Sequence, residues 1–143
     1  TTIVKAGSQA AFRHVDFDIP LEVANIARAN GAKKFLLVSS MGASSGSPVF
    51  YSRTKGELEN ELKKLNYETL IILRPSILLG IRKEKRLGEA VGRFAAEKLS
   101  FLFAGALKKY KGTPADLLGK LMVKLAQEKI TGVKILENEE IVK

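Results

Sequence analysis

The sequence predicts a single α/β domain in which helices cover both faces of a parallel sheet. Residues 35–38 and 70–73 are short, uninterrupted apolar runs, and such runs suit strands that are buried on both faces. A helical pattern separates them, so strand and helix alternate along the chain. A length of 143 residues, with 45% hydrophobic and 27% charged residues, suits one globular domain with a real core.

The first half of the chain predicts two helices and two strands. Asp18 is a suitable N-cap for the first helix, which turns Leu21, Ala24, Ile26 and Ala27 inward and stops at Asn30-Gly31. A strand over residues 34–40 follows, then a loop rich in glycine and serine over residues 41–48. The second helix begins near residues 48–51 and reaches residue 65, and a second strand over residues 69–74 ends at Pro75. Gly56 lies inside this helix, where glycine costs up to ~1 kcal/mol relative to alanine, so we expect another segment to approach closely there.

The second half predicts two more helices and a closing strand. One helix lies within residues 87–103, and the other begins at Thr113 as N-cap with Pro114 in the first helical position. Residues 133–136 form the closing strand. The phenylalanines at 94, 101 and 103 are expected in the core, and the alternatives are an apolar substrate pocket or the face of a homodimer.

Composition excludes several classes of function. The chain has no cysteine and one histidine, which argues against disulfides, thiolate metal sites and histidine-based triads. Its apolar runs are shorter than the ~18 to 20 residues that span a bilayer, and no signal-peptide pattern opens it, so we expect a cytoplasmic protein without a membrane partner. The net charge of +9 raises nucleic acid as a partner, but the basic residues are scattered and lack interleaved aromatics.

Polar residues that suit catalysis or ligand binding follow both predicted strands. Tyr51 and Lys55 are four residues apart, which places them on one face of the second helix. A lysine ammonium beside a phenol stabilises the phenolate, and this favours proton transfer to or from a carbonyl oxygen. Ser39 and Ser40 end one strand and Arg74-Pro75 ends the other, at the carboxyl edge where parallel sheets bind ligands.

These patterns together resemble the short-chain dehydrogenase/reductase superfamily. The supporting segments are Thr1-Thr2-Ile3 with Lys5-Ala6-Gly7-Ser8, Phe12-Arg13 with Val15-Asp16-Phe17-Asp18, Val38-Ser39-Ser40-Met41-Gly42-Ala43, residues 51–57 and residues 74–80. The chain is most similar to the atypical NAD(P)-binding group that includes the Tat-interacting-protein type oxidoreductases and epimerase-like proteins. The resemblance implies a Rossmann-type, doubly wound, three-layer parallel sheet. None of the twelve glycines forms the family's phosphate-binding turn, so residues 1–143 are expected to be the C-terminal two-thirds of such a domain.

The resemblance also assigns roles to residues. It implies that Tyr51 is the general acid/base, that Lys55 contacts the cofactor ribose and the phenol, and that Ser40, preferred over Ser39, orients the reacting oxygen. Backbone groups of Ile77 and Leu78 would hold the nicotinamide carboxamide. Arg86 would reach a phosphate and favour NADP over NAD, although a solvated basic cluster is the alternative for that residue.

The leading hypothesis is therefore an NAD(P)-dependent oxidoreductase that moves hydride between nicotinamide and a carbonyl or alcohol of an unknown small molecule. Two alternatives stay open at this point. One is a nucleotide-sugar epimerase or dehydratase, and the other is an NADPH-binding regulator with little catalysis. Because the last hypothesis uses the same binding residues, the sequence leaves open whether the protein is an enzyme at all.

Overall fold

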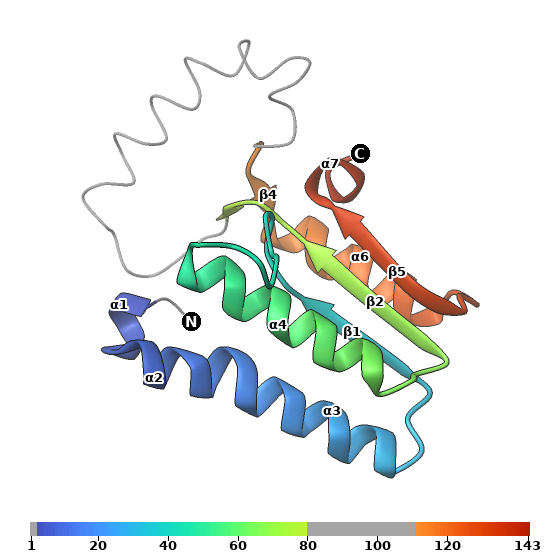
Figure 1. Cartoon of the computed structure of the whole chain (residues 1–143). Helices are drawn as coiled ribbons and strands as arrows, with labels where there is room; N and C mark the ends of the chain where they lie inside the picture. The colour runs from blue at the N-terminus through green and yellow to red at the C-terminus, as the bar shows by residue number, and fades with distance from the viewer. Residues whose placement is uncertain (1–2, 80–110) are drawn as a thin grey trace.

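The computed structural model describes residues 3–79 and 111–143 and confirms a mixed α/β architecture with a small parallel sheet. Its strands lie in the order β1-β2-β5, with bounds β1 (Lys34–Val38), β2 (Thr69–Arg74) and β5 (Gly132–Glu137). Both pairings are parallel, so the three carboxyl ends meet at one edge of the sheet. Helices α3 (Ile19–Ala29) and α4 (Phe50–Lys64) lie on one side of the sheet and α6 (Ala115–Gln127) lies on the other (Figure 1).

The central strand β2 is buried on both faces. Leu70 and Ile72 belong to the core cluster on the side of α3 and α4, whereas Ile71 and Leu73 belong to the cluster on the side of α6. None of these four residues is more than 1% exposed. Because neighbouring strand residues point to opposite faces, an uninterrupted apolar run is what such a strand requires. The strand prediction over residues 69–74 is therefore confirmed.

The N-terminal helical run begins earlier than the sequence predicted. It consists of α1 (Ile3–Ala6), α2 (Gln9–Arg13), the π-helical turn η1 (His14–Asp18) and α3. Ser8 is the N-cap of α2, and its hydroxyl accepts a hydrogen bond from the amide of Ala11 at 3.0 Å. Asp18 has helical backbone angles and no capping bond, so its prediction as N-cap was wrong.

A proline inside this run accounts for the error. Pro20 has no amide hydrogen, and in a regular α-helix its ring would clash with the carbonyl four residues earlier. The chain instead makes the wider η1 turn, in which the amide of Ile19 donates to the carbonyl of His14, five residues back. The helix therefore continues through a sequence that resembles a helix start.

One residue of α3 points away from the expected face. Ala24 is fully buried and Leu21 packs against the same cluster, as predicted. Ile26 is 56% exposed, so its predicted inward position was wrong. Positions two residues apart on a helix lie on different faces, and Ile26 therefore cannot share a face with Ala24.

The start of α6 also differs from the prediction. Thr113 and Pro114 form the short strand β4 (Thr113–Pro114), which pairs with β3 (Leu78–Leu79), and α6 begins at Ala115. The fully buried Thr113 hydroxyl hydrogen-bonds the side chain of Asn138, the first residue of α7 (Asn138–Ile141), and it is not a helix cap. The helix expected within residues 87–103, its phenylalanines and Arg86 lie outside the described residues.

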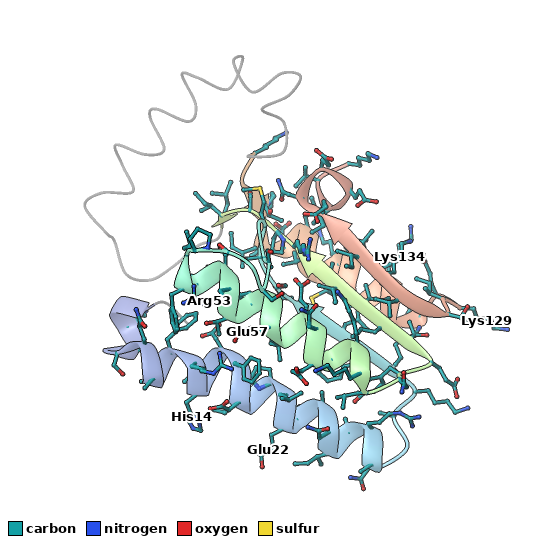
Figure 2. All side chains as sticks on the ribbon, in the orientation of Figure 1. His14, Glu22, Arg53, Glu57, Lys129 and Lys134 are labelled. Atoms are coloured by element: carbon teal, nitrogen blue, oxygen red, sulfur yellow. The ribbon has the colours of Figure 1, made fainter. Side chains whose placement is uncertain are left out.

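The outer surface carries charged side chains. Figure 2 shows His14 and Glu22 pointing away from the N-terminal helical run, with Lys129 and Lys134 on the β5 side of the molecule.

In residues 3–79 and 111–143, no helix is both long and apolar enough to cross a membrane. The same residues contain no group of three acidic, histidine or cysteine side chains arranged to hold a metal ion.

Gly56 marks a close contact between α4 and the loop that follows β1. A Cβ atom at this position would lie 2.3 Å from both the carbonyl carbon of Ser44 and the amide nitrogen of Ser45. The amide of Ser44 donates to the carbonyl of Ser52 at 3.1 Å, so the loop is also hydrogen-bonded to the helix. This close approach explains why the helix contains a glycine.

We expect Gly56→Ala to lower the free energy of unfolding, in the range of about 1–3 kcal/mol, because the added methyl group would overlap backbone atoms. Gly119→Ala in α6 is the matched control, since nothing lies within 4 Å of its Cβ position. This control should gain up to ~1 kcal/mol from helix propensity. Urea denaturation of both variants is the measurement, and a Gly56→Ala protein as stable as the wild type would contradict the contact.

Candidate functional site

A pocket of about 660 Å³ opens beside the carboxyl ends of β1 and β2. Its lining consists of Lys5, Asp16, Val38, Ser39, Ser40, Met41, Tyr51, Lys55, Pro75, Ser76, Ile77 and Leu78. This pocket thus brings together every predicted site residue that the structure describes. Arg86 lies outside the described residues, and the functional roles of the others stay predictions.

Tyr51 is held by an aromatic cluster at the start of α4. Its ring lies 5.5 Å from the ring of Phe12, which is fully buried, and Phe12 also meets Phe50 edge to face at 5.8 Å. Such aromatic contacts restrict the ring of Tyr51 beyond what burial alone would do. The tyrosine therefore lines the pocket from a fixed position.

Lys55 forms a buried ion pair with Asp16. Its Nζ lies 2.5 Å from Oδ1 of Asp16, and the two side chains are only 11% and 6% exposed. Removing two charges from water is costly, and opposite charges at this distance offset the cost. The sequence suggested that the Lys55 ammonium contacts the Tyr51 phenol and a ribose. In the structure this ammonium has a carboxylate partner.

Sequence reasoning did not assign Asp16 to the site. Asp16 follows Phe12 by four residues, which places both on the inward face of the same helical run. A carboxylate on an inward face requires a cation or several hydrogen-bond donors. The position of an acidic residue on an inward helix face could be read from the sequence. It does not say which of the many lysines and arginines is the partner.

The two serines after β1 have different surroundings. Ser39 is buried and donates a hydrogen bond from its hydroxyl to Oε1 of Glu59 at 2.6 Å. Ser40 is half-buried, and its hydroxyl makes a long contact of 3.5 Å with the carbonyl of Met41. Ser39 is thus engaged with the protein interior, which leaves the hydroxyl of Ser40 as the better-placed donor for a ligand.

Arg74 ties the sheet to α4. Its Nε and Nη2 donate to the two carboxylate oxygens of Glu59 at 3.0 and 2.6 Å, and its Nη1 donates to Glu137 at 2.8 Å. The Glu59 side chain is only 1% exposed. The hydrogen bonds to Glu59 raise the pKa of the Arg74 guanidinium above its usual value, so the arginine stays charged.

The turn after β2 is anchored at its base and exposed at its tip. The amide of Ser76 donates to the side chains of Thr113 and Asn138 at 3.2 and 3.1 Å. By contrast, Ile77 is 77% exposed and Leu78 is 37% exposed, although a buried strand exit was one interpretation of their apolar side chains. The carbonyl of Ile77 accepts a hydrogen bond from the amide of Thr113 at 2.9 Å, so the exposure of this turn lies mainly in its side chains.

The chain is similar to fungal proteins named as mitochondrial. It is 38% identical to "Protein FMP52, mitochondrial" of Candida albicans, in a match that covers 100% of this chain and 64% of that protein. It is 39% identical to "Protein fmp52, mitochondrial" of Emericella nidulans, over 92% of this chain and 56% of that protein. The chain thus spans 64% and 56% of the lengths of these two relatives. No protein-family model matches it.

These findings correct three expectations from the sequence. The relatives carry the name FMP52, and no family model supports the assignment to the short-chain dehydrogenase/reductase superfamily, so that assignment is contradicted. The NAD(P)-dependent oxidoreductase function inferred from it is contradicted by the same names, which describe no such activity. The cytoplasmic location is contradicted because the relatives are named as mitochondrial proteins.

We expect Arg74→Met to destabilise the protein by about 3–5 kcal/mol, because it leaves the Glu59 carboxylate buried and without its cation. Arg13→Met is the matched control. Arg13 pairs with Glu57 at 2.5 Å, but the two side chains are 41% and 32% exposed, so the loss should be at most about 1 kcal/mol. Urea denaturation measures both, and similar losses in the two variants would show that the Arg74 pair is no more important than a surface pair.

Proposed function

We propose that the pocket binds the nicotinamide-ribose half of a dinucleotide cofactor, NAD or NADP. The observation that carries this proposal is the convergence of Ser40, Tyr51, Lys55 and the 75–78 turn on one pocket beside two parallel strand ends. In open α/β sheets, ligands bind outside the carboxyl ends of the strands. A pocket with a few convergent polar groups among apolar ones is also what a small-molecule site requires.

Each of these groups has a role suited to its surroundings. The Tyr51 hydroxyl and the Lys55 ammonium are proposed to bind the ribose hydroxyls, since together they supply donors and an acceptor. Backbone groups of residues 77–78 that the pairing with β4 does not use would hold the carboxamide of the nicotinamide. Ser40 would donate to a polar atom of the ring substituent or of a small molecule beside it, and Arg86 would bind a phosphate of NADP.

We further propose that residues 1–143 belong to one domain with a doubly wound, three-layer sheet of the Rossmann type. The support is the central strand β2, which buries Leu70 and Ile72 on one face and Ile71 and Leu73 on the other. Strands covered by helices on both faces are characteristic of such sheets.

The names of the fungal relatives support a mitochondrial location for the protein, which fractionation of cells expressing the tagged protein would test.

We expect NAD or NADP to bind the protein in isothermal titration calorimetry and Tyr51→Phe to weaken that binding about tenfold. This variant retains the aromatic ring against Phe12 and removes only the hydroxyl, and one lost hydrogen bond is worth about 1 kcal/mol or slightly more. Tyr67→Phe is the matched control. The Tyr67 hydroxyl donates to the carbonyl of Ala24 in the core, so its loss should lower stability and leave affinity unchanged.

Two outcomes would contradict this proposal. The first is a wild-type protein that binds neither dinucleotide at millimolar concentration. The second is a wild-type protein that binds one of them but loses the same affinity in Tyr67→Phe as in Tyr51→Phe.

A further inference from the structure

The lining of the pocket includes a buried ion pair. Asp16 and Lys55 both line it, their charged atoms are 2.5 Å apart, and their side chains are 6% and 11% exposed. We call these two side chains the pocket floor. Their charges are opposite, so the pocket floor offers both hydrogen-bond donors and acceptors, and the carboxylate offsets the charge of the ammonium.

A π turn in the N-terminal helical run carries Asp16 at the pocket floor. Asp16 is the middle residue of the π turn η1, and the turn is preceded by a helix that buries Phe12 and followed by one that contains Pro20. Within the same turn, Asp18 and His14 form an exposed pair at 3.5 Å, and His14 points away from the molecule in Figure 2. Single π turns occur frequently at functional sites, where they redirect a side chain.

Lysines that bind phosphate or carboxylate groups present an uncompensated positive charge to them. Lys55 differs because Asp16 neutralises its ammonium in a place where water screens little. An anionic group at the pocket floor would face the Asp16 carboxylate as well as the ammonium. A hydroxyl group would meet no such repulsion, because it can donate to one of these groups and accept from the other.

We propose that Asp16 is a specificity-determining and positioning residue. By pairing with Lys55 it reserves the pocket floor for an uncharged, hydroxyl-bearing part of the ligand, such as a ribose, and excludes phosphate and carboxylate groups from it. This inference rests on the proposed function, since it states which part of the dinucleotide meets Lys55.

The test compares Asp16→Asn with Asp18→Asn, which removes the exposed carboxylate two residues away in the same turn. Two quantities are measured at about pH 6, where lysine is ordinarily charged. They are the affinity for the dinucleotide by calorimetry, and the rise in melting temperature caused by inorganic phosphate. We expect Asp16→Asn to bind the dinucleotide about tenfold more weakly or worse, and to gain stabilisation by phosphate because Lys55 is then uncompensated.

Asp18→Asn should match the wild type in both measurements, which also controls for the general stabilising effect of phosphate on proteins. If Asp16→Asn is unfolded without added anions, recovery of its folded state by phosphate but not by equal ionic strength of chloride supports the proposal. Failure of phosphate to restore folding, or to stabilise the folded variant beyond the control, overturns it.

A third variant, Asp16→Glu, keeps the charge and adds one methylene group. We expect it to remain insensitive to phosphate, because Lys55 retains a counter-charge, and to lose dinucleotide affinity only in part. A phosphate response as large as that of Asp16→Asn would overturn the proposal. The proposed function fails if the wild type binds no dinucleotide. The present inference fails on its own if the wild type binds the dinucleotide but Asp16→Asn behaves like Asp18→Asn.

Discussion

The carboxylate of Glu59 holds together the strand ends and the helix that form the pocket. It accepts two hydrogen bonds from Arg74 at the end of β2 and one from Ser39 at the end of β1, and Arg74 reaches on to Glu137 at the end of β5. One buried carboxylate thereby links three strand ends and α4. Because α4 also carries Tyr51 and Lys55, the relative position of the helix and the strands determines the shape of the pocket. A buried ion pair is weak evidence for net stability, but a shift of this pair would move the parts of the lining that α4 and the ends of β1 and β2 contribute.

The parts of the fold set by local sequence could be predicted, and those set by distant partners could not. Strands β1 and β2 and helix α4 follow from the apolar pattern of the sequence, which depends only on neighbouring residues. The N-terminal helical run was misjudged because Asp18 and Pro20 locally resemble a helix start, whereas the chain continues through a π turn. Thr113 was misjudged for the opposite reason. Its hydroxyl is engaged by Asn138, a residue that local sequence could not connect to it.

The site shows the same division. The spacing of Tyr51 and Lys55 predicted that both lie on one face of a helix, and in the structure both line the pocket. It did not reveal that Lys55 is paired with Asp16, because this contact joins residues 39 positions apart. The spacing of residue types therefore pointed to residues that line a pocket. The chemistry of those residues depends also on spatial neighbours, such as Asp16, that the spacing does not include. The comparison with fungal proteins shows how far apart the two can be, since the activity inferred from the pattern was contradicted.

The double burial of β2 has a consequence for how the protein folds. Lys34 pairs with Thr69, whereas Thr69 pairs with Gly132, so the second pairing closes almost twice as much chain as the first. Closing a longer loop loses more entropy and delays the contacts that depend on it. The β1-α4-β2 unit should therefore form first, with Ile71 and Leu73 still facing water until α6 and β5 arrive. During that interval the nascent protein exposes an apolar strand face, which makes it prone to aggregate and a natural substrate for chaperones.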